Sequence, residues 1–181
     1  MQFRRIGQLV AATTVSAVAL SGAQAVAQEN KTTISVTNIT DIHGHLEDKI
    51  GDPAKAGDEI GVARLQTLIK QVNEGQEFNL TSSGDNVGGS AFVSAISDDK
   101  YTLEALNKMG MKVSAVGNHE FDKGTEDLTE RIQPNSTYPI LGANVLKDGQ
   151  PLLEPSHVED VDGVKVGYVC LLYTSDAADE E

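Results

Sequence analysis

Cysteine is almost absent from the sequence, since Cys170 is the only one among 181 residues. A single cysteine excludes an internal disulfide framework, so packing or a bound metal must supply the stability. Basic residues are also scarce: 14 lysines and arginines stand against 27 aspartates and glutamates, for a formal net charge of −13. A nucleic-acid-binding surface is expected to be basic. The acidic balance therefore argues against a nucleic-acid polymer as partner.

A long apolar run is missing as well. The apolar stretch at residues 9–23 contains Thr, Ser and Gly, and it is shorter than the roughly 20 strongly apolar residues of a membrane span. It follows Arg4 and Arg5 and leads into two overlapping Ala-x-Ala triplets. This order is typical of a secretory signal peptide, so residues 1–27 are predicted to be one. The protein is then expected to be secreted, periplasmic or cell-wall associated, with no transmembrane span after cleavage.

Apolar periodicity predicts strands that alternate with helices along the rest of the chain. The expected strands lie within residues 32–40, 78–85, 112–120, 138–145 and 164–172, and the expected helices within 62–75, 102–110 and 125–132. The first helix is expected to bury one face, made of Val62, Leu65, Leu68, Ile69 and Val72. Thr125 is a candidate N-cap for the third. The Gly- and Asp-rich residues 49–61 predict a long surface loop. Such alternation indicates an α/β domain with largely parallel strands.

Three polar motifs each follow an expected strand: Asp41-x-His43, Gly84-Asp85-Asn86, and the run from Gly117 to Asp122. In open parallel sheets the ligand site lies in the loops beyond the carboxyl ends of the strands. All three motifs are therefore expected at one edge of the sheet.

The residue types in these motifs suit metal and phosphate chemistry. Asp41 and His43 are two residues apart, so on an extended segment both side chains point the same way. Asp85 offers a carboxylate, Asn118 offers an amide oxygen, and Asp122 stands three residues after His119, close enough to orient its ring. Taken singly, each has an ordinary explanation, such as an Asx turn for Asp85 or a hydrogen-bonded loop histidine for His119.

In combination, the segments "TDIHGHLED", "SSGDNVGGS", "ALNKMGMKVSAVGNHEFDKG" and "PILGANV" resemble the metallophosphoesterase superfamily. The finer resemblance is to its exported 5′-nucleotidase branch, which includes UDP-sugar hydrolases and 2′,3′-cyclic-nucleotide phosphodiesterases. The resemblance implies an α/β sandwich of mixed sheets flanked by helices. It also implies a metal-dependent phosphoric ester hydrolase that acts on a nucleotide or nucleotide-sugar.

The resemblance also implies roles for individual residues. Asp41 and His43 would bind the first of two divalent metal ions, with zinc and manganese both suitable. Asp85 would bridge the two ions, and Asn118 would bind the second ion and the substrate phosphate. His119 would contact the substrate and stabilise the transition state or protonate the leaving oxygen, with Asp122 as its partner.

Some expected parts of the family pattern are missing. The resemblance implies two further histidines, from a later strand and a Gly-His-x-His motif, a Gln or His ligand for the first metal, and a C-terminal nucleoside-binding domain. Downstream of His119 the sequence holds only His157, which is expected on the surface, as His45 is expected in a loop. The domain is therefore expected to be incomplete at its C-terminal end, and this chain alone to be inactive.

Residues 28–169 are accordingly predicted to be the N-terminal part of a metallophosphoesterase domain. The stretch "CLLYTSDAADEE", residues 170–181, resembles translated sequencing-adapter sequence and is predicted to be a non-native tail. An apolar strand at residues 164–172 is expected to be buried in a complete domain and to lack neighbours here, which would weaken the fold. The alternative is a non-catalytic secreted fragment that binds metal weakly, or binds a partner through the acidic loop 47–59.

Overall fold

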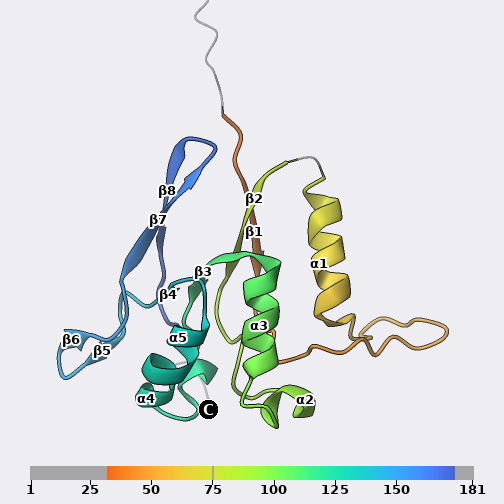
Figure 1. Cartoon of the computed structure of the whole chain (residues 1–181), viewed down its shortest axis with the longest axis horizontal. Coiled ribbons are helices and arrows are strands. Elements are labelled where there is room, and N and C mark those ends of the chain that lie inside the picture. Colours follow the sequence, from red (N-terminus) through yellow and green to blue (C-terminus); the bar gives the residue numbers. More distant parts are fainter. Residues whose placement is uncertain (1–31, 75, 174–181) are drawn as a thin grey trace, which may run out of the picture. The chain divides into compact units, whose positions relative to one another are not determined.

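Four parallel strands form the central sheet (Figure 1). Its order is β1 (Ser35–Ile39), β2 (Phe78–Ser82), β3 (Met111–Ala115) and β4 (Ile140–Leu141). The computed structural model describes residues 32–74 and 76–173, so the predicted signal peptide and the last eight residues of the predicted tail lie outside the described residues. The expected α/β class with a parallel sheet is confirmed.

The helices follow the strands in the expected order. They are α1 (Gly61–Val72), α2 (Phe92–Ala95), α3 (Lys100–Met109) and a continuous helical run made of α4 (Thr125–Asp127), η2 (Leu128–Ile132) and α5 (Gln133–Asn135), while a short 3-10 turn, η1 (His119–Phe121), follows β3. The N-cap prediction for Thr125 is wrong: Thr125 is the first residue of α4, and Gly124 precedes it as the cap.

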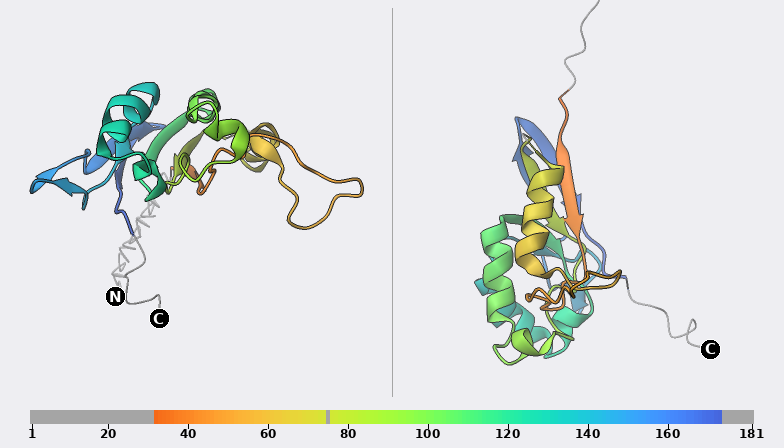
Figure 2. Two further views of the ribbon diagram at one scale, coloured as in Figure 1. Left: turned by 90° about the horizontal axis from the view of Figure 1, so that it is seen from below. Right: turned by 90° about the vertical axis from the view of Figure 1, so that its right-hand side faces the viewer.

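The hydrophobic core lies between the sheet and these helices. Leu80 of β2 joins a buried cluster with Ile69 of α1 and with Leu103 and Leu106 of α3, and α1 and α3 lie on the same side of the sheet (Figure 2). Consecutive strand residues point to opposite faces, so Asn79 lies on the other face. There its side chain donates a hydrogen bond of 3.0 Å to the Tyr168 hydroxyl.

The apolar face predicted for α1 is only partly buried. Ile69 is buried and Leu65 packs against the core, but Leu68 is 46% exposed and Val72 is 83% exposed. The reason is the place of the helix, because α1 precedes β2 and its nearest strand β1 is the edge of the sheet. The core therefore reaches only one flank of the helix.

The C-terminal part forms antiparallel hairpins that the sequence did not predict. β7 (Ser156–Val161) pairs with β8 (Val164–Val169) over six residue pairs, and β5 (Leu146–Lys147) pairs with β6 (Gln150–Pro151). The expectation that the last strand lacks neighbours is wrong, since β7 is its partner. In this chain β8 is not buried, because its residues alternate between half-buried and exposed; its burial in a complete domain stays a prediction.

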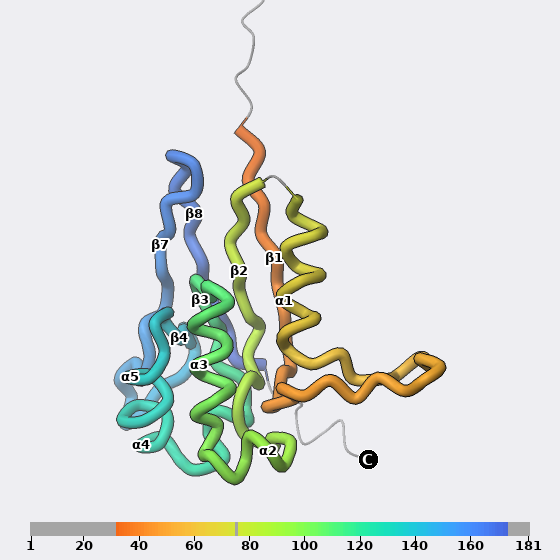
Figure 3. The backbone as a smooth tube through the Cα atoms, turned by 45° about the vertical axis from the view of Figure 1, so that its right-hand side comes forward, coloured from red at the N-terminus to blue at the C-terminus, as the bar shows by residue number. Residues whose placement is uncertain are grey.

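The loop between β1 and α1 extends away from the rest of the domain (Figure 3). It is irregular, as predicted, apart from one antiparallel bridge between Lys49 and Glu59. Some of its acidic groups are paired within the chain: Asp48 pairs with Arg64, and Asp58 accepts the backbone N–H groups of Gly51 and Lys55. Among the helices of residues 32–74 and 76–173, none is long and apolar enough to cross a membrane.

Candidate metal centre

Three loops meet at the carboxyl ends of β1, β2 and β3, as the sequence predicted. Backbone hydrogen bonds join the first two, from Asp41 N–H to Gly84 O (3.1 Å) and from His43 N–H to Asp85 O (3.1 Å). The third loop is attached by a bond of 2.8 Å from His119 N–H to the Asp85 carboxylate. The Asp85 loop therefore stands between the other two and fixes both.

Asp41, His43 and Asp85 form a cluster suited to a metal ion. Each offers one ligand atom, and these atoms all lie within 4.8 Å of one another. The geometry differs from the extended segment that the sequence suggested: Asp41 and His43 have φ values of 54° and 42°, and Asp85 has 53°. Left-handed turns, rather than strand alternation, bring the two side chains together. Carboxylate oxygens with an imidazole nitrogen suit zinc, manganese and related ions.

A second hydrogen bond fixes the ring of His43. Its Nδ1 lies 2.7 Å from the carbonyl oxygen of Gly88, and a carbonyl can only accept, so Nδ1 carries the proton. The lone pair is then on Nε2, which lies 3.8 Å from Asp41 Oδ1. Metal-binding histidines commonly donate their other ring N–H in this way. The donor set and its tautomer therefore fit a divalent ion.

His119 and Asp122 lie next to this cluster. Nδ1 of His119 is 3.2 Å from both carboxylate oxygens of Asp122, and the rings of His119 and His43 meet edge to face with centroids 4.8 Å apart. The hydrogen bond that His119 Nδ1–H donates to the Asp122 carboxylate raises the pKa of His119, against a smaller opposing effect of burial.

This pKa shift predicts a titration in the metal-free protein. His119 is expected to titrate above its ordinary value of 6.5, and the Asp122→Asn variant to titrate lower, because the neutral amide stabilises the imidazolium less. The stabilising contribution of the pair is present below pH 6.5 and is lost as the pH rises through the folded-state pKa. NMR titration of the His119 ring protons measures both midpoints, and equal midpoints would contradict the prediction.

Asn118, the fourth predicted metal ligand, lies directly before η1. Its carbonyl accepts the N–H of Phe121 and begins η1, and its side chain is exposed next to His119. The histidines without a predicted metal role lie elsewhere. His45 bonds Glu59 (2.8 Å) in the loop, and His157 bonds Glu159 (2.9 Å) on β7.

Glu120 is a residue that sequence reasoning missed. It is 3% exposed, and its carboxylate accepts four backbone N–H groups: those of Gly117 (2.6 Å), Asp85 (3.0 Å), Asn86 (2.8 Å) and Val87 (3.4 Å). Burial raises the pKa of Glu120, and these donors oppose the rise. The sequence held one signal for a buried carboxylate: this acid lies directly between His119 and an apolar residue, just after a buried strand.

Glycine is required where the second and third loops touch. A Cβ on Gly117 would lie 2.2 Å from Asp85 Oδ1 and 2.5 Å from Asp85 N. The Gly117→Ala variant is therefore expected to lose about 1–3 kcal/mol of unfolding free energy through overpacking. Gly167→Ala is the matched control, because nothing lies within 4 Å of its Cβ position; it is expected to be neutral or slightly stabilising. Urea unfolding of both variants checks the difference, and equal stabilities would contradict it.

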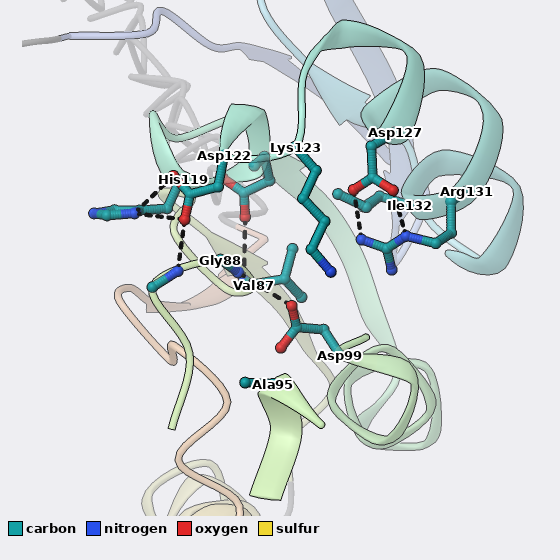
Figure 4. A pocket seen from close by; sticks show the side chains of 12 residues that line it. Val87, Gly88, Ala95, Asp99, His119, Asp122, Lys123, Asp127, Arg131 and Ile132 are labelled. Atoms are coloured by element: carbon teal, nitrogen blue, oxygen red, sulfur yellow. Dashed lines mark hydrogen bonds and ion pairs between the residues drawn. The ribbon is translucent and has the colours of Figure 1, made fainter. Parts of the chain in front are cut away.

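A small cavity of about 120 Å³ opens beside His119 and Asp122 (Figure 4). Its two basic side chains are already paired: Arg131 forms a bidentate ion pair with Asp127, and Lys123 bonds Asp98 (2.6 Å). Asp99 lines the same cavity and is buried. The cavity therefore offers no unpaired positive charge to an anion.

Comparison with known proteins shows the family and the fold of this chain. The family model for calcineurin-like phosphoesterases matches residues 34–171. The cell wall protein Lmo0130 of Listeria monocytogenes is 31% identical over 196 aligned residues, which cover 92% of this chain and 25% of the relative. A 5′-nucleotidase of Mus musculus is 31% identical and covers 75% of this chain and 25% of the relative. The endonuclease YhcR of Bacillus subtilis is 27% identical, with 80% and 13% covered.

Solved structures share the fold. The NAD nucleotidase of Haemophilus influenzae superposes with a TM-score of 0.62 at 22% identity, covering 77% of this chain and 26% of that one. A 5′-nucleotidase precursor from Thermus thermophilus gives 0.58 at 22% identity, covering 77% and 28%. The chain spans about a quarter or less of the length of these relatives. Since the family model covers most of the sequence, from the first strand to the last, the chain belongs to the calcineurin-like phosphoesterase family.

Proposed function

We propose that this chain carries part of the active site of an exported, metal-dependent phosphoesterase that hydrolyses nucleotides in the manner of a 5′-nucleotidase. The observation that carries the proposal is the cluster of Asp41, His43 and Asp85, whose ligand atoms lie within 4.8 Å, next to the His119 ring. Metal ions can activate a water molecule for attack on a phosphoester, and an oriented imidazole can protonate the leaving oxygen.

Each residue has a distinct proposed role. Asp41 and His43 would hold one ion, Asp85 would contact this ion and a second one, and Asn118 would bind the second ion and the substrate phosphate. When bound, divalent ions supply Lewis acidity and lower the pKa of the attacking water. His119 turns Nδ1 to Asp122, which leaves Nε2 to donate a proton or a hydrogen bond to a phosphoryl or leaving oxygen.

The substrate class is proposed from the relatives, two of which are named 5′-nucleotidase and NAD nucleotidase. A nucleotide-sugar is a second substrate of the same chemistry. The remaining ligands are proposed to come from sequence beyond these 181 residues, because His157 lies on β7 in a bond with Glu159. The 181-residue chain is then expected to bind metal and to turn over substrate weakly or not at all.

The experiment has a binding arm and a turnover arm. The 181-residue chain is expected to bind Zn²⁺ or Mn²⁺ in calorimetry, with affinity lost in the Asp41→Ala and Asp85→Ala variants. The complete product of the same reading frame is expected to release phosphate from AMP, or UMP and glucose 1-phosphate from UDP-glucose, only with divalent metal. A DNA oligonucleotide is tested as a substrate in the same assay, because one relative is named an endonuclease. Turnover without metal would overturn the proposal. So would a metal affinity that is the same in both variants as in the unmodified chain.

A further inference from the structure

The peptide between Gly88 and Gly89 is hydrogen-bonded at both ends to groups of the candidate metal centre. Its carbonyl, on Gly88, accepts the Nδ1–H of His43 at 2.7 Å. Its N–H, on Gly89, donates to Asp122 Oδ2 at 2.7 Å. One peptide unit therefore connects a predicted metal ligand to a carboxylate that belongs to a different loop.

The same carboxylate also holds His119. Both oxygens of Asp122 lie 3.2 Å from His119 Nδ1, and Figure 4 shows Asp122 between the His119 ring and the Gly88 loop. Asp122 is thus linked by hydrogen bonds to two histidines, to His119 directly and to His43 through one peptide. Hydrogen bonds in such a chain polarise one another, so an N–H bonded to a carboxylate makes its carbonyl a better acceptor.

The close approach that allows this depends on glycine. A Cβ on Gly88 would lie 2.0 Å from the His119 carbonyl oxygen and 2.9 Å from Asp122 Oδ2, and the φ of Gly88 is +80°. Asp99 holds the loop from the opposite side, accepting the Gly88 N–H at 3.3 Å and the Ser94 hydroxyl at 2.7 Å. Asp99 therefore fixes the preceding peptide, between Val87 and Gly88, while His43 and Asp122 bond the Gly88–Gly89 peptide itself.

We propose that Asp122 is a positioning residue for the metal ligand His43 as well as for His119. By holding the Gly88–Gly89 peptide, Asp122 keeps the proton of His43 on Nδ1 and presents Nε2 to the cluster with Asp41 and Asp85. This inference rests on the metal site of the proposed function. It goes beyond that function because it assigns one carboxylate to both halves of the centre.

The test compares two substitutions at one position. Asp122→Ala removes the acceptor for Gly89 N–H, so Zn²⁺ affinity is expected to fall about 10–100-fold, the usual effect of losing a partner that orients a ligand. Asp122→Asn keeps an oxygen that can accept this bond, so its loss of affinity is expected to be far smaller. His119→Ala leaves the Gly89 bond in place and is expected to keep the affinity. Competition with a chromophoric chelator, using the 181-residue chain and Zn²⁺ alone, measures all three.

Two results would overturn the inference. Equal losses in Asp122→Ala and Asp122→Asn would mean that only the charge of Asp122 matters, and an unchanged Asp122→Ala would mean that the peptide does not act on His43. If the unmodified chain binds no Zn²⁺ through Asp41, the metal site itself fails. The inference is then decided by the ¹⁵N spectrum of the metal-free His43 ring, where Asp122→Ala is expected to mix the tautomers and Asp122→Asn to keep Nδ1–H. An unchanged tautomer in Asp122→Ala would refute it.

Discussion

His119→Ala is expected to lower nucleotide turnover by about 10²–10⁴-fold, the range for losing a positioned acid or base. The ring is oriented by Asp122 through Nδ1 at 3.2 Å, and it stands 4.8 Å from the His43 ring. Since Nδ1 faces Asp122, Nε2 is the ring nitrogen left to act on a phosphoryl or leaving oxygen in the proposed function. The measurement is phosphate release by the complete product of the reading frame, with divalent metal at saturation.

The control for His119 is His157→Ala. His157 lies on β7 and bonds only Glu159 among the described residues, so its removal is expected to leave turnover unchanged. Zn²⁺ affinity is measured in parallel and is expected to be retained in both variants. Turnover within a few-fold of the unmodified protein in His119→Ala, at saturating metal, would show that His119 has no part in the chemistry.

Glu120→Gln is expected to lower the free energy of unfolding by about 2–6 kcal/mol. Each carboxylate oxygen of Glu120 accepts two backbone N–H groups. An amide replaces one of these oxygens with an NH₂ donor, so two buried N–H groups lose their acceptor, at a cost of about 1–3 kcal/mol each. Urea unfolding of the 181-residue chain measures the change.

Glu126→Gln provides the matched control for Glu120. Glu126 bonds Lys147 at 2.7 Å, and its side chain is 68% exposed. Exposed ion pairs contribute little to stability, so this variant is expected to stay close to the unmodified chain. Equal losses in the two variants would mean that Glu120 does not hold the loops together.

Much of the candidate site could be predicted from the sequence because its residues occupy short motifs at strand ends. The carboxyl ends of parallel strands meet at one edge, so Asp41, Asp85 and His119 were expected together and are brought together. Glu120 was not predicted, because a carboxylate with four backbone partners depends on two loops that are 30 residues apart. The exposure of Val72 was also not predicted, because periodicity shows which face of a helix is apolar, and does not show how far the core extends.

The sequence by itself determined the class of the domain, the order of its first strands and helices, and the residues that gather at the sheet edge. These follow from local periodicity and from motif positions, which act over a few residues. The hairpin of β7 and β8 is local, because only Asp162 and Gly163 join its strands, and this Asp-Gly turn signal in the sequence was overlooked. Only the tertiary structure decided the left-handed turns at Asp41 and His43, whose N–H groups bond the carbonyls of Gly84 and Asp85, and the peptide that connects His43 to Asp122. These depend on contacts between segments far apart in the chain, which stabilise the structure only once the loops have packed against one another.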